Sequence, residues 1–300
     1  MNSLRQQLKR HFHLADTLER FILINVGVFL IVRLVNAISY LFLVPVFTFD
    51  QVSHYLAFPA NPISFLHRPW TLITYMFYHW DVLHILFNML WLYWMGKILQ
   101  EYLGSKKILS TYFLGGICGG IFYFTAYNLF PLFAPHSATS FALGASASVL
   151  AITVAAATLL PEYPIQLLFF GNVKLKYIAL VSILLDLISV SGNNAGGHIA
   201  HLGGALFGFI YIRQLKKGND LAKWFIRLTE IGKRKSKSKM KVSVDDSKRM
   251  KRDEKFNVQK KAKQEIMDEI LDKISRSGYG SLTNGEKEFL FKISKEEGKE

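Results

Sequence analysis

A serine and a histidine stand at the heads of two apolar segments of this 300-residue chain. Ser146 follows Gly144-Ala145 and begins one segment, and His201 begins another 55 residues later. Polar side chains lose hydrogen bonds to water in such surroundings, so they are usually retained for a reason. A serine hydroxyl paired with an imidazole is the arrangement of a nucleophile and its base. Ser146 and His201 are therefore the candidate catalytic residues.

A second polar pair lies earlier in the chain. His84 and Asn88 are four residues apart, so they share one face of a helix. Both side chains can donate hydrogen bonds, and attack on a carbonyl requires donors aimed at the developing oxyanion. A single histidine at a membrane interface is more often a packing residue. The pair together favours a role in the reaction.

The composition indicates that these residues lie in a membrane. Hydrophobic residues make up 51% of the chain. Residues 213–300 hold 25 of the 36 Lys and Arg residues and 15 of the 22 Asp and Glu residues, which leaves an apolar body ahead of a basic tail. A soluble domain with so few charges would expose large apolar patches. The single cysteine, Cys118, excludes an internal disulfide, and the polar residues 1–20 do not resemble a cleavable signal.

Six apolar runs predict six transmembrane helices. They lie at Phe21–Leu43, Val82–Leu99, Ile108–Phe130, Ser146–Leu160, Tyr177–Val190 and His198–Leu215. Lys and Arg gather in residues 1–20 and in the second-to-third and fourth-to-fifth connections, whereas the loops 131–145 and 191–197 contain none. The positive-inside rule then predicts a multi-pass protein of the cell (inner or plasma) membrane with both termini in the cytoplasm.

This orientation predicts that the polar residues meet. Spans two, four and six run from outside to inside, so His84, Asn88, Ser146 and His201 all lie toward their outer ends. The fourth span is about fifteen residues, or roughly 22 Å, which is shorter than the ~30 Å hydrocarbon core. We therefore expect a water-filled recess above Ser146, with the serine at a helix N-terminus that favours an oxyanion.

Small residues predict how the helices approach. Gly204 and Gly208 share a face with His201, and alanines at intervals of four follow Ser146 on the fourth span. Such patterns let helix backbones nearly touch, and we expect Gly144, Gly204 and Gly208 to provide close packing at the site. The alternative, that the glycines serve packing alone, does not explain the histidine.

These residues resemble the motifs of the rhomboid intramembrane serine proteases, including bacterial members. The likeness rests on His84-x-x-x-Asn88, on Gly144-x-Ser146 and on Ala200-His201-x-x-Gly204-x-x-x-Gly208. The motifs occur in the family's order on corresponding spans, and the resemblance covers about residues 55–215.

The resemblance implies an all-α, six-helix rhomboid bundle and a Ser146–His201 dyad without an acidic member or a cofactor. Ser146 would attack the scissile carbonyl, and His201 would act as base and then as acid. His84, Asn88 and the backbone N–H of Ser146 would form the oxyanion hole. The loops 131–145 and 191–197 with span five would admit a transmembrane segment of a substrate protein from the lipid.

Three positions depart from the family's pattern. The family commonly has glycine where this chain has Ala147, and many relatives have an aromatic residue in place of Leu150. The family's Trp-Arg in the first loop is replaced by Trp70 with Arg68 two residues before it. These changes bear on the fine positioning of the site and on the shape of the first loop.

His198 and His201 share a helical face and raise the possibility of a metal site. Two histidines without a nearby carboxylate or thiolate fall short of a zinc ligand set, so no metal is expected.

The chain divides into four predicted parts: an N-terminal cytoplasmic segment (1–20), the membrane domain (21–215), a basic cytoplasmic linker (216–263) and a small helical hairpin (264–300). Within the linker, residues 231–252 are rich in Lys and Arg. Anionic lipid is the expected partner of this run rather than nucleic acid, and a solvated charge run that only fixes topology is an equal alternative. The hairpin resembles a tail module of some bacterial rhomboids.

Two functions remain open from the sequence. The first is an intramembrane endopeptidase acting on transmembrane proteins. The second is a non-catalytic protein of the same fold that binds or escorts transmembrane clients, and a transporter is a more distant third. Since binding alone does not need both Ser146 and His201, the sequence favours the protease.

Overall fold

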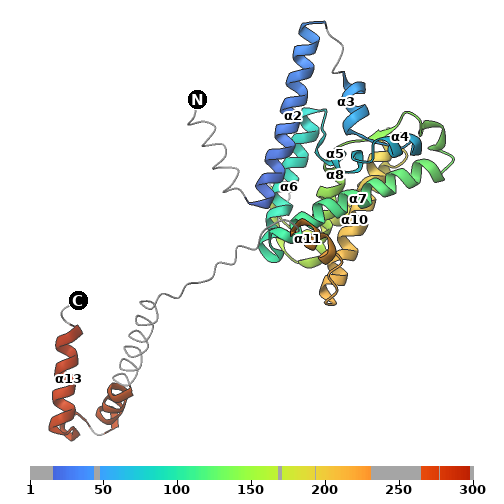
Figure 1. Cartoon of the computed structure of the whole chain (residues 1–300). Helices are drawn as coiled ribbons and strands as arrows, with labels where there is room; N and C mark the ends of the chain where they lie inside the picture. Colours follow the sequence, from blue (N-terminus) through green and yellow to red (C-terminus); the bar gives the residue numbers. More distant parts are fainter. Residues whose placement is uncertain are drawn as a thin grey trace. The chain divides into compact units, whose positions relative to one another are not determined.

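The computed structural model describes residues 16–43, 48–167, 171–192, 194–230, 265–276 and 278–297. The chain forms two compact units, Met1–Gly232 and Lys233–Glu300. The first contains the helical body of the protein (Figure 1), and the described residues of the second form two helices.

Six helices occur where the sequence predicts spans. They are α2 (Thr17–Leu41), α6 (Val82–Leu103), α7 (Ser105–Leu129), α8 (Ser146–Leu159), α9 (Leu175–Ser189) and α10 (Ala195–Lys216). Local chemistry fixes several of their ends. Asp16 and Glu19 form a capping box at the start of α2. Gly104, with φ +78°, supplies the left-handed residue that turns α6 into α7.

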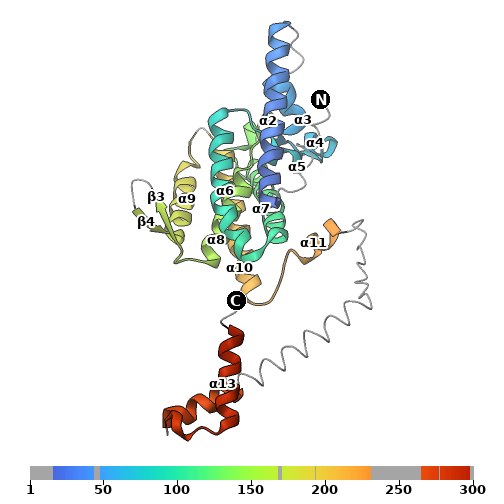
Figure 2. The ribbon, with the colours of Figure 1, turned by 90° about the vertical axis from the view of Figure 1, so that its left-hand side faces the viewer.

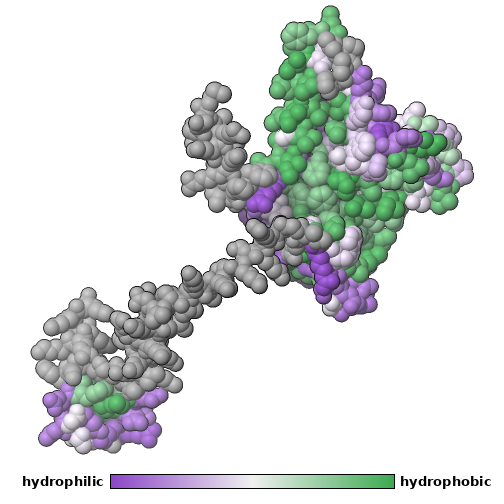
Figure 3. Space-filling model, in the orientation of Figure 1, coloured by the Kyte–Doolittle hydropathy of each residue, from purple (hydrophilic) through white to green (hydrophobic). Residues whose placement is uncertain are grey.

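The helical bundle expected from the sequence is confirmed. Four of the helices, α2, α6, α7 and α10, are long and apolar enough to cross a membrane. Helix α8 has 14 residues, or about 21 Å, and α9 has 15. Hydrophobic side chains cover α2 and much of the bundle surface (Figure 3), as expected for a multi-pass membrane protein. The count of six spans remains a prediction.

Helix α8 occupies the centre of the bundle and contacts α6, α7, α9 and α10. Eleven of its 14 residues are buried. On the α10 side, a side chain at Gly204 would collide with the carbonyl of Ala147, and one at Gly208 with the carbonyl of Ala151. On the α7 side, a side chain at Gly115 would collide with the methyl group of Ala151. Helix α8 is therefore held between glycine-lined faces of two neighbours.

The first loop contains helices and a strand that the sequence did not predict. It contains α3 (Phe49–Leu56), β1 (Phe58–Pro59), α4 (Pro62–His67), α5 (Thr71–Thr74) and the 3-10 turn η1 (Tyr75–Phe77). Strand β1 pairs antiparallel with β2 (Phe141–Ala142), which follows the 3-10 turn η2 (Ala134–His136). This pairing ties the first loop to the segment that leads into α8.

Arg68 and Trp70 hold the first loop together, although Arg68 precedes the tryptophan in this chain. The Arg68 guanidinium donates to the carbonyl of His54, and Trp70 Nε1 donates to the carbonyl of Tyr55 at 3.0 Å. Both bonds fasten the α4–α5 turn to the end of α3.

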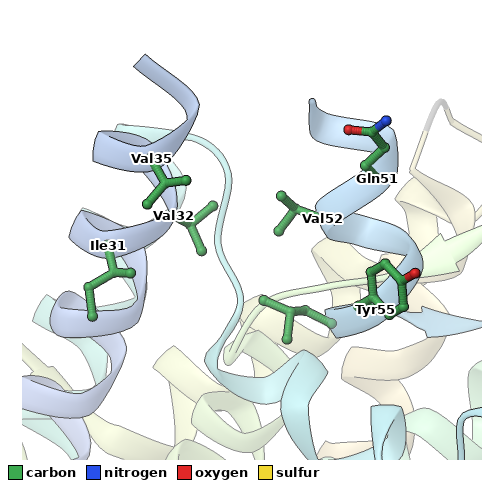
Figure 4. A pocket seen from close by; sticks show the side chains of 7 residues that line it. Ile31, Val32, Val35, Gln51, Val52 and Tyr55 are labelled. Atoms are coloured by element: carbon green, nitrogen blue, oxygen red, sulfur yellow. The ribbon is translucent and has the colours of Figure 1, made fainter. Parts of the chain in front are cut away.

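Between α3 and α2 lies an apolar cavity of about 340 Å³, lined by residues such as Val32, Val35 and Val52 (Figure 4).

A short hairpin joins α8 to α9. Strands β3 (Pro164–Leu167) and β4 (Gly171–Lys174) pair antiparallel beside α9 (Figure 2). At its base Glu162 accepts hydrogen bonds from Lys174 and Lys176, which lower the pKa of its carboxyl group to about 2. The hairpin is therefore closed by an exposed ion-pair cluster at the start of α9.

After α10 the chain departs from the predicted linker of residues 216–263. Residues Lys223–Glu230 form helix α11, because apolar residues at helical spacing pack against α7. The basic run 231–252 lies outside the described residues.

The second unit holds the predicted hairpin helices. A helix spans residues 265–276, followed by the 3-10 turn η3 (Tyr279–Ser281) and α13 (Asn284–Glu297). Lys273 pairs with Glu286 at 2.8 Å, and Thr283 also donates to Glu286, so the pKa of the Glu286 carboxyl group falls to about 2. The two helices are thus joined by an ion pair, and Ile270 on the first helix and Leu282 in the connection are both buried.

Gly208→Ala is expected to destabilise the bundle by about 1–3 kcal/mol, because the new methyl group would overlap the Ala151 carbonyl. The matched control is Gly27→Ala in α2, where nothing lies within 4 Å of an added Cβ. Thermal unfolding in detergent measures both. Equal midpoints for the two variants would contradict the close approach of α8 and α10.

Candidate active site

The four predicted site residues line one cavity. This cavity of about 460 Å³ lies among α6, α8, α9 and α10, and its polar lining comprises His84, Asn88, Ser146, Ser182, Asp186 and His201. Its other walls are apolar: Leu83, Phe87 and Trp91 of α6, Val149 and Leu150 of α8, and Leu185 of α9. The structure therefore brings together residues that are far apart in the sequence.

Ser146 is the first residue of α8, as expected from the sequence. The residue before the helix, Ala145, offers no side-chain cap to the first turn. The approach to the helix is fixed instead by two backbone donors: Gly144 N–H donates to the Tyr75 carbonyl at 2.9 Å, and Ala145 N–H donates to His79 Nε2 at 3.2 Å. The positive end of the α8 dipole thus begins at the serine.

His79 is a buried residue near the site that the sequence did not predict. It is fully buried, and its ring lies against that of His84 with centroids 5.1 Å apart. Because it accepts from Ala145, it couples the loop ahead of Ser146 to the histidine on α6. No spacing or motif in the sequence marked it.

Gly144 makes room for His84 rather than for a neighbouring helix. It has φ +110°, and a Cβ at this position would come within 2.7 Å of His84 Cε1 and 2.9 Å of Nε2. The imidazole therefore lies over the backbone of Gly144. In contrast, Gly204 and Gly208 lie between helices, in the role expected of them.

Asn88 keeps part of its hydrogen-bonding capacity. Its Nδ2 donates to the backbone carbonyl of His84 at 2.9 Å within α6. An amide group carries two N–H bonds, so one further donor is left on the same nitrogen.

Asp186 changes the expectation of a dyad without an acidic member. Its Oδ1 lies 2.8 Å from His201 Nδ1 and 2.8 Å from His198 Nδ1. Asp186 is the one acidic residue within the six predicted spans, so the sequence does carry a signal for it. A buried carboxylate needs hydrogen-bond partners in place of water, and the two imidazoles supply them.

The hydrogen bond to Asp186 determines which atom of His201 is free. When Nδ1–H donates to the carboxylate, Nε2 carries the lone pair. In the described part of the chain, no hydrogen bond joins Ser146 to His201, but both residues line the cavity. The geometry is that of a nucleophile and a base in one recess, with the base oriented by a third group.

The departures at Ala147 and Leu150 are absorbed by the surroundings. The Ala147 methyl group faces Gly119 of α7, where an added Cβ would come within 2.6 Å of it. The glycine on α7 therefore compensates for the extra methyl group on α8. Leu150 lines the cavity together with His201, but it has no ring to stack on the imidazole.

Asp186, His198 and His201 also form a group whose ligand atoms lie within 4.8 Å of one another. A carboxylate therefore does lie beside the two histidines, contrary to the sequence-based argument against a metal. With each Nδ1 used in a hydrogen bond to Oδ1, however, the three atoms already satisfy one another. The absence of a metal stays a prediction.

Comparison with known families places these features in context. Residues 66–217, about half of the chain, match the Rhomboid domain. Residues 251–296 match a family of unknown function, DUF6576.

Individual relatives are similar over parts of their length. The chain is 31% identical over 157 residues to RHOMBOID-like protein 12, mitochondrial, of Arabidopsis thaliana, covering 49% of this chain and 47% of that protein. It is 31% identical over 163 residues to Presenilin-associated rhomboid-like protein A, mitochondrial, of Danio rerio, covering 52% and 39%. It is 33% identical over 72 residues to Rhomboid protease GlpG of Salmonella newport, covering 24% and 26%. The matches span less than half of each relative.

Gly144→Ala is expected to destabilise the fold more than Gly171→Ala does. Both positions have positive φ, so alanine is strained at each by about 1–2 kcal/mol, but only at Gly144 would the methyl group also displace an imidazole. Nothing lies within 4 Å of an added Cβ at Gly171. Unfolding midpoints of the two variants isolate the contact with His84, and equal losses would contradict it.

Proposed function

Since the chain belongs to the rhomboid family, we propose that it is an intramembrane serine endopeptidase that cleaves peptide bonds in or near transmembrane segments. The observation that carries the proposal is the shared cavity in which Ser146 and His201 lie with His84 and Asn88. Of the three relatives named above, GlpG is named as a protease, and the other two are named as rhomboid-like proteins.

In this proposal Ser146 Oγ attacks the carbonyl carbon of the scissile bond. His201 Nε2 takes the proton of the hydroxyl and later gives it to the leaving amine. Asp186 accepts the Nδ1–H of His201, which holds the ring in the required tautomer and stabilises the imidazolium. In the second half, His201 Nε2 takes a proton from water, whose oxygen attacks the acyl carbon; the bond to Ser146 Oγ then breaks, and His201 returns the proton to Oγ. The mechanism needs no cofactor.

The oxyanion would be stabilised by three donors around the cavity. The backbone N–H of Ser146 begins α8 without a side-chain cap, so the helix dipole adds to its effect. The second Nδ2–H of Asn88 and the ring of His84 would complete the set. Gly144 supports this role because it leaves space for the His84 ring beside the serine.

The substrate class follows from the walls of the cavity. Phe87 and Trp91 of α6 and Leu185 of α9 all line it, so an apolar segment is the fitting ligand. We propose that a transmembrane segment of a substrate protein reaches Ser146 between α6 and α9. We further propose a location in the cell membrane with both termini cytoplasmic, which the distribution of Lys and Arg among the loops supports.

Ser146→Ala and His201→Ala are each expected to abolish cleavage of a model transmembrane substrate in proteoliposomes, because each removes one half of the proton-transfer pair. Ser148→Ala is the matched control. Ser148 is two residues further along α8, and its buried hydroxyl has no hydrogen-bond partner in the described structure. If wild type cleaves none of a broad panel, the chain is instead a binding protein of the same fold; if all variants cleave equally, the assigned nucleophile is wrong.

Asp186→Asn is expected to lower kcat by roughly 10²- to 10⁴-fold, because the amide no longer stabilises the imidazolium or fixes its tautomer. His198→Gln leaves the bond between Asp186 and His201 available and is expected to retain activity within about tenfold. Steady-state assays that separate kcat from KM distinguish the two. Full activity of Asp186→Asn, or an equal loss in His198→Gln, would contradict the assigned role.

A further inference from the structure

Helix α11 presents three different faces along its eight residues. One face packs on the body: Ala222 just before the helix is fully buried, and Phe225 and Ile226 pack inward. A second face is apolar and exposed. Trp224 and Leu228, four residues apart on the helix, are 60% and 58% exposed, and Leu221 in the turn just before the helix is 42% exposed.

The third face is basic. Lys223 and Arg227 are exposed beside the apolar stripe and form no ion pair with a carboxylate in the described part of the chain. A helix with a packed face, an apolar face and a basic face suits a position where protein, hydrocarbon and lipid headgroups meet.

The turn before α11 directs the helix back along the bundle. Asp220 pairs with Lys107 near the start of α7, and its Oδ1 also accepts from Tyr211 of α10 and from the backbone N–H of Ala222. These contacts fix the chain after α10 has ended, and they fasten it to the neighbouring helix.

The depth of α11 follows from its aromatic contact. The rings of Phe225 and Phe113 are 5.8 Å apart. Phe113 lies eight residues after Ser105, the first residue of α7, which is about 12 Å along the helix axis. Phe113 also contacts Phe21 of α2, another helix that begins at this end of the bundle. Helix α11 therefore lies alongside the first turns of a membrane helix and not beyond its end.

We infer that α11 lies on the bilayer surface, with the stripe Leu221, Trp224 and Leu228 in the hydrocarbon boundary and Lys223 and Arg227 against anionic phospholipid headgroups. Tryptophan is enriched at this boundary, and basic residues there gain attraction to anionic lipid. The surface lies on the side where the second-to-third connection carries its lysines. The inference concerns membrane attachment and stands independently of the proposed protease activity.

Fluorescent labels on α11 test the placement. The chain has a single cysteine, so a Cys118→Ser background allows one label at Leu228→Cys or, as the matched control, at Lys223→Cys. In full-chain proteoliposomes, the label at 228 is expected to be quenched by lipid carrying a spin label on its acyl chain and shielded from aqueous iodide. The label at 223 is expected to show the reverse.

Two results would overturn the placement. If iodide quenches both labels equally, α11 lies in water; if neither quencher reaches position 228, protein covers the stripe. Because the labelled variants alter the chain, the unlabelled protein gives a second measurement. Brominated lipid is expected to quench wild type more than Trp224→Phe, and equal quenching would also overturn the placement.

The preference for anionic lipid is tested by vesicle composition. Adding phosphatidylglycerol to phosphatidylcholine vesicles is expected to increase the lipid quenching at position 228. The double substitution Lys223→Gln and Arg227→Gln is expected to lower the ratio of lipid-bound to released helix roughly thirtyfold in the mixed vesicles. If phosphatidylglycerol does not change the lipid quenching of the labelled chain that keeps Lys223 and Arg227, the assignment of anionic headgroups is overturned.

Discussion

The close contact of α8 with glycines on both sides is the constraint on which the rest of the structure depends. Carbonyl groups of Ala147 and Ala151 lie against Gly204 and Gly208 of α10, and the alanine methyl groups lie against Gly119 and Gly115 of α7. Without the hydrophobic effect to drive association inside a bilayer, such van der Waals contact must supply the specificity. It also fixes the site, because Ser146 begins the held helix and His201 lies one turn before Gly204.

Buried polar groups form a second layer of constraint around this core. Asp186 accepts from both His198 and His201, so one carboxylate orients two rings on α10 from the neighbouring α9. His79 performs a related task for the loop before Ser146, where it accepts from Ala145. A charge or an imidazole in these places is costly unless it is paired. The pairs therefore tie the positions of α6, α8, α9 and α10 to one another at the cavity.

Compensation between helices explains how the site tolerates its unusual residues. Ala147 carries a methyl group where relatives of this kind commonly have glycine, and Gly119 on α7 yields the space. Arg68 and Trp70 stand in a different order from the family's pair, yet both donate to carbonyls at the end of α3. In both places a contact within this chain accommodates the residue that differs.

The sequence by itself determined the helices, the family and the four residues that share the cavity. Hydropathy located the helices because a bilayer requires long apolar segments with internally satisfied backbones. Hydropathy did not predict the short elements α3, α4, the β3–β4 hairpin and α11. They have too few residues for a helical or strand periodicity to stand out, and their contacts are distant in sequence.

Only the tertiary structure decided the finer chemistry of the site. Asp186 is visible in the sequence as a lone acid in a predicted span, but its partners come from another helix, 12 and 15 residues away. His79 carried no signal at all, and Gly144 proved to accommodate a ring instead of a helix. Periodicity reports which face of a helix a residue occupies. Which side chain lies opposite that face is set by how the helices pack, and that packing is a property of the whole chain.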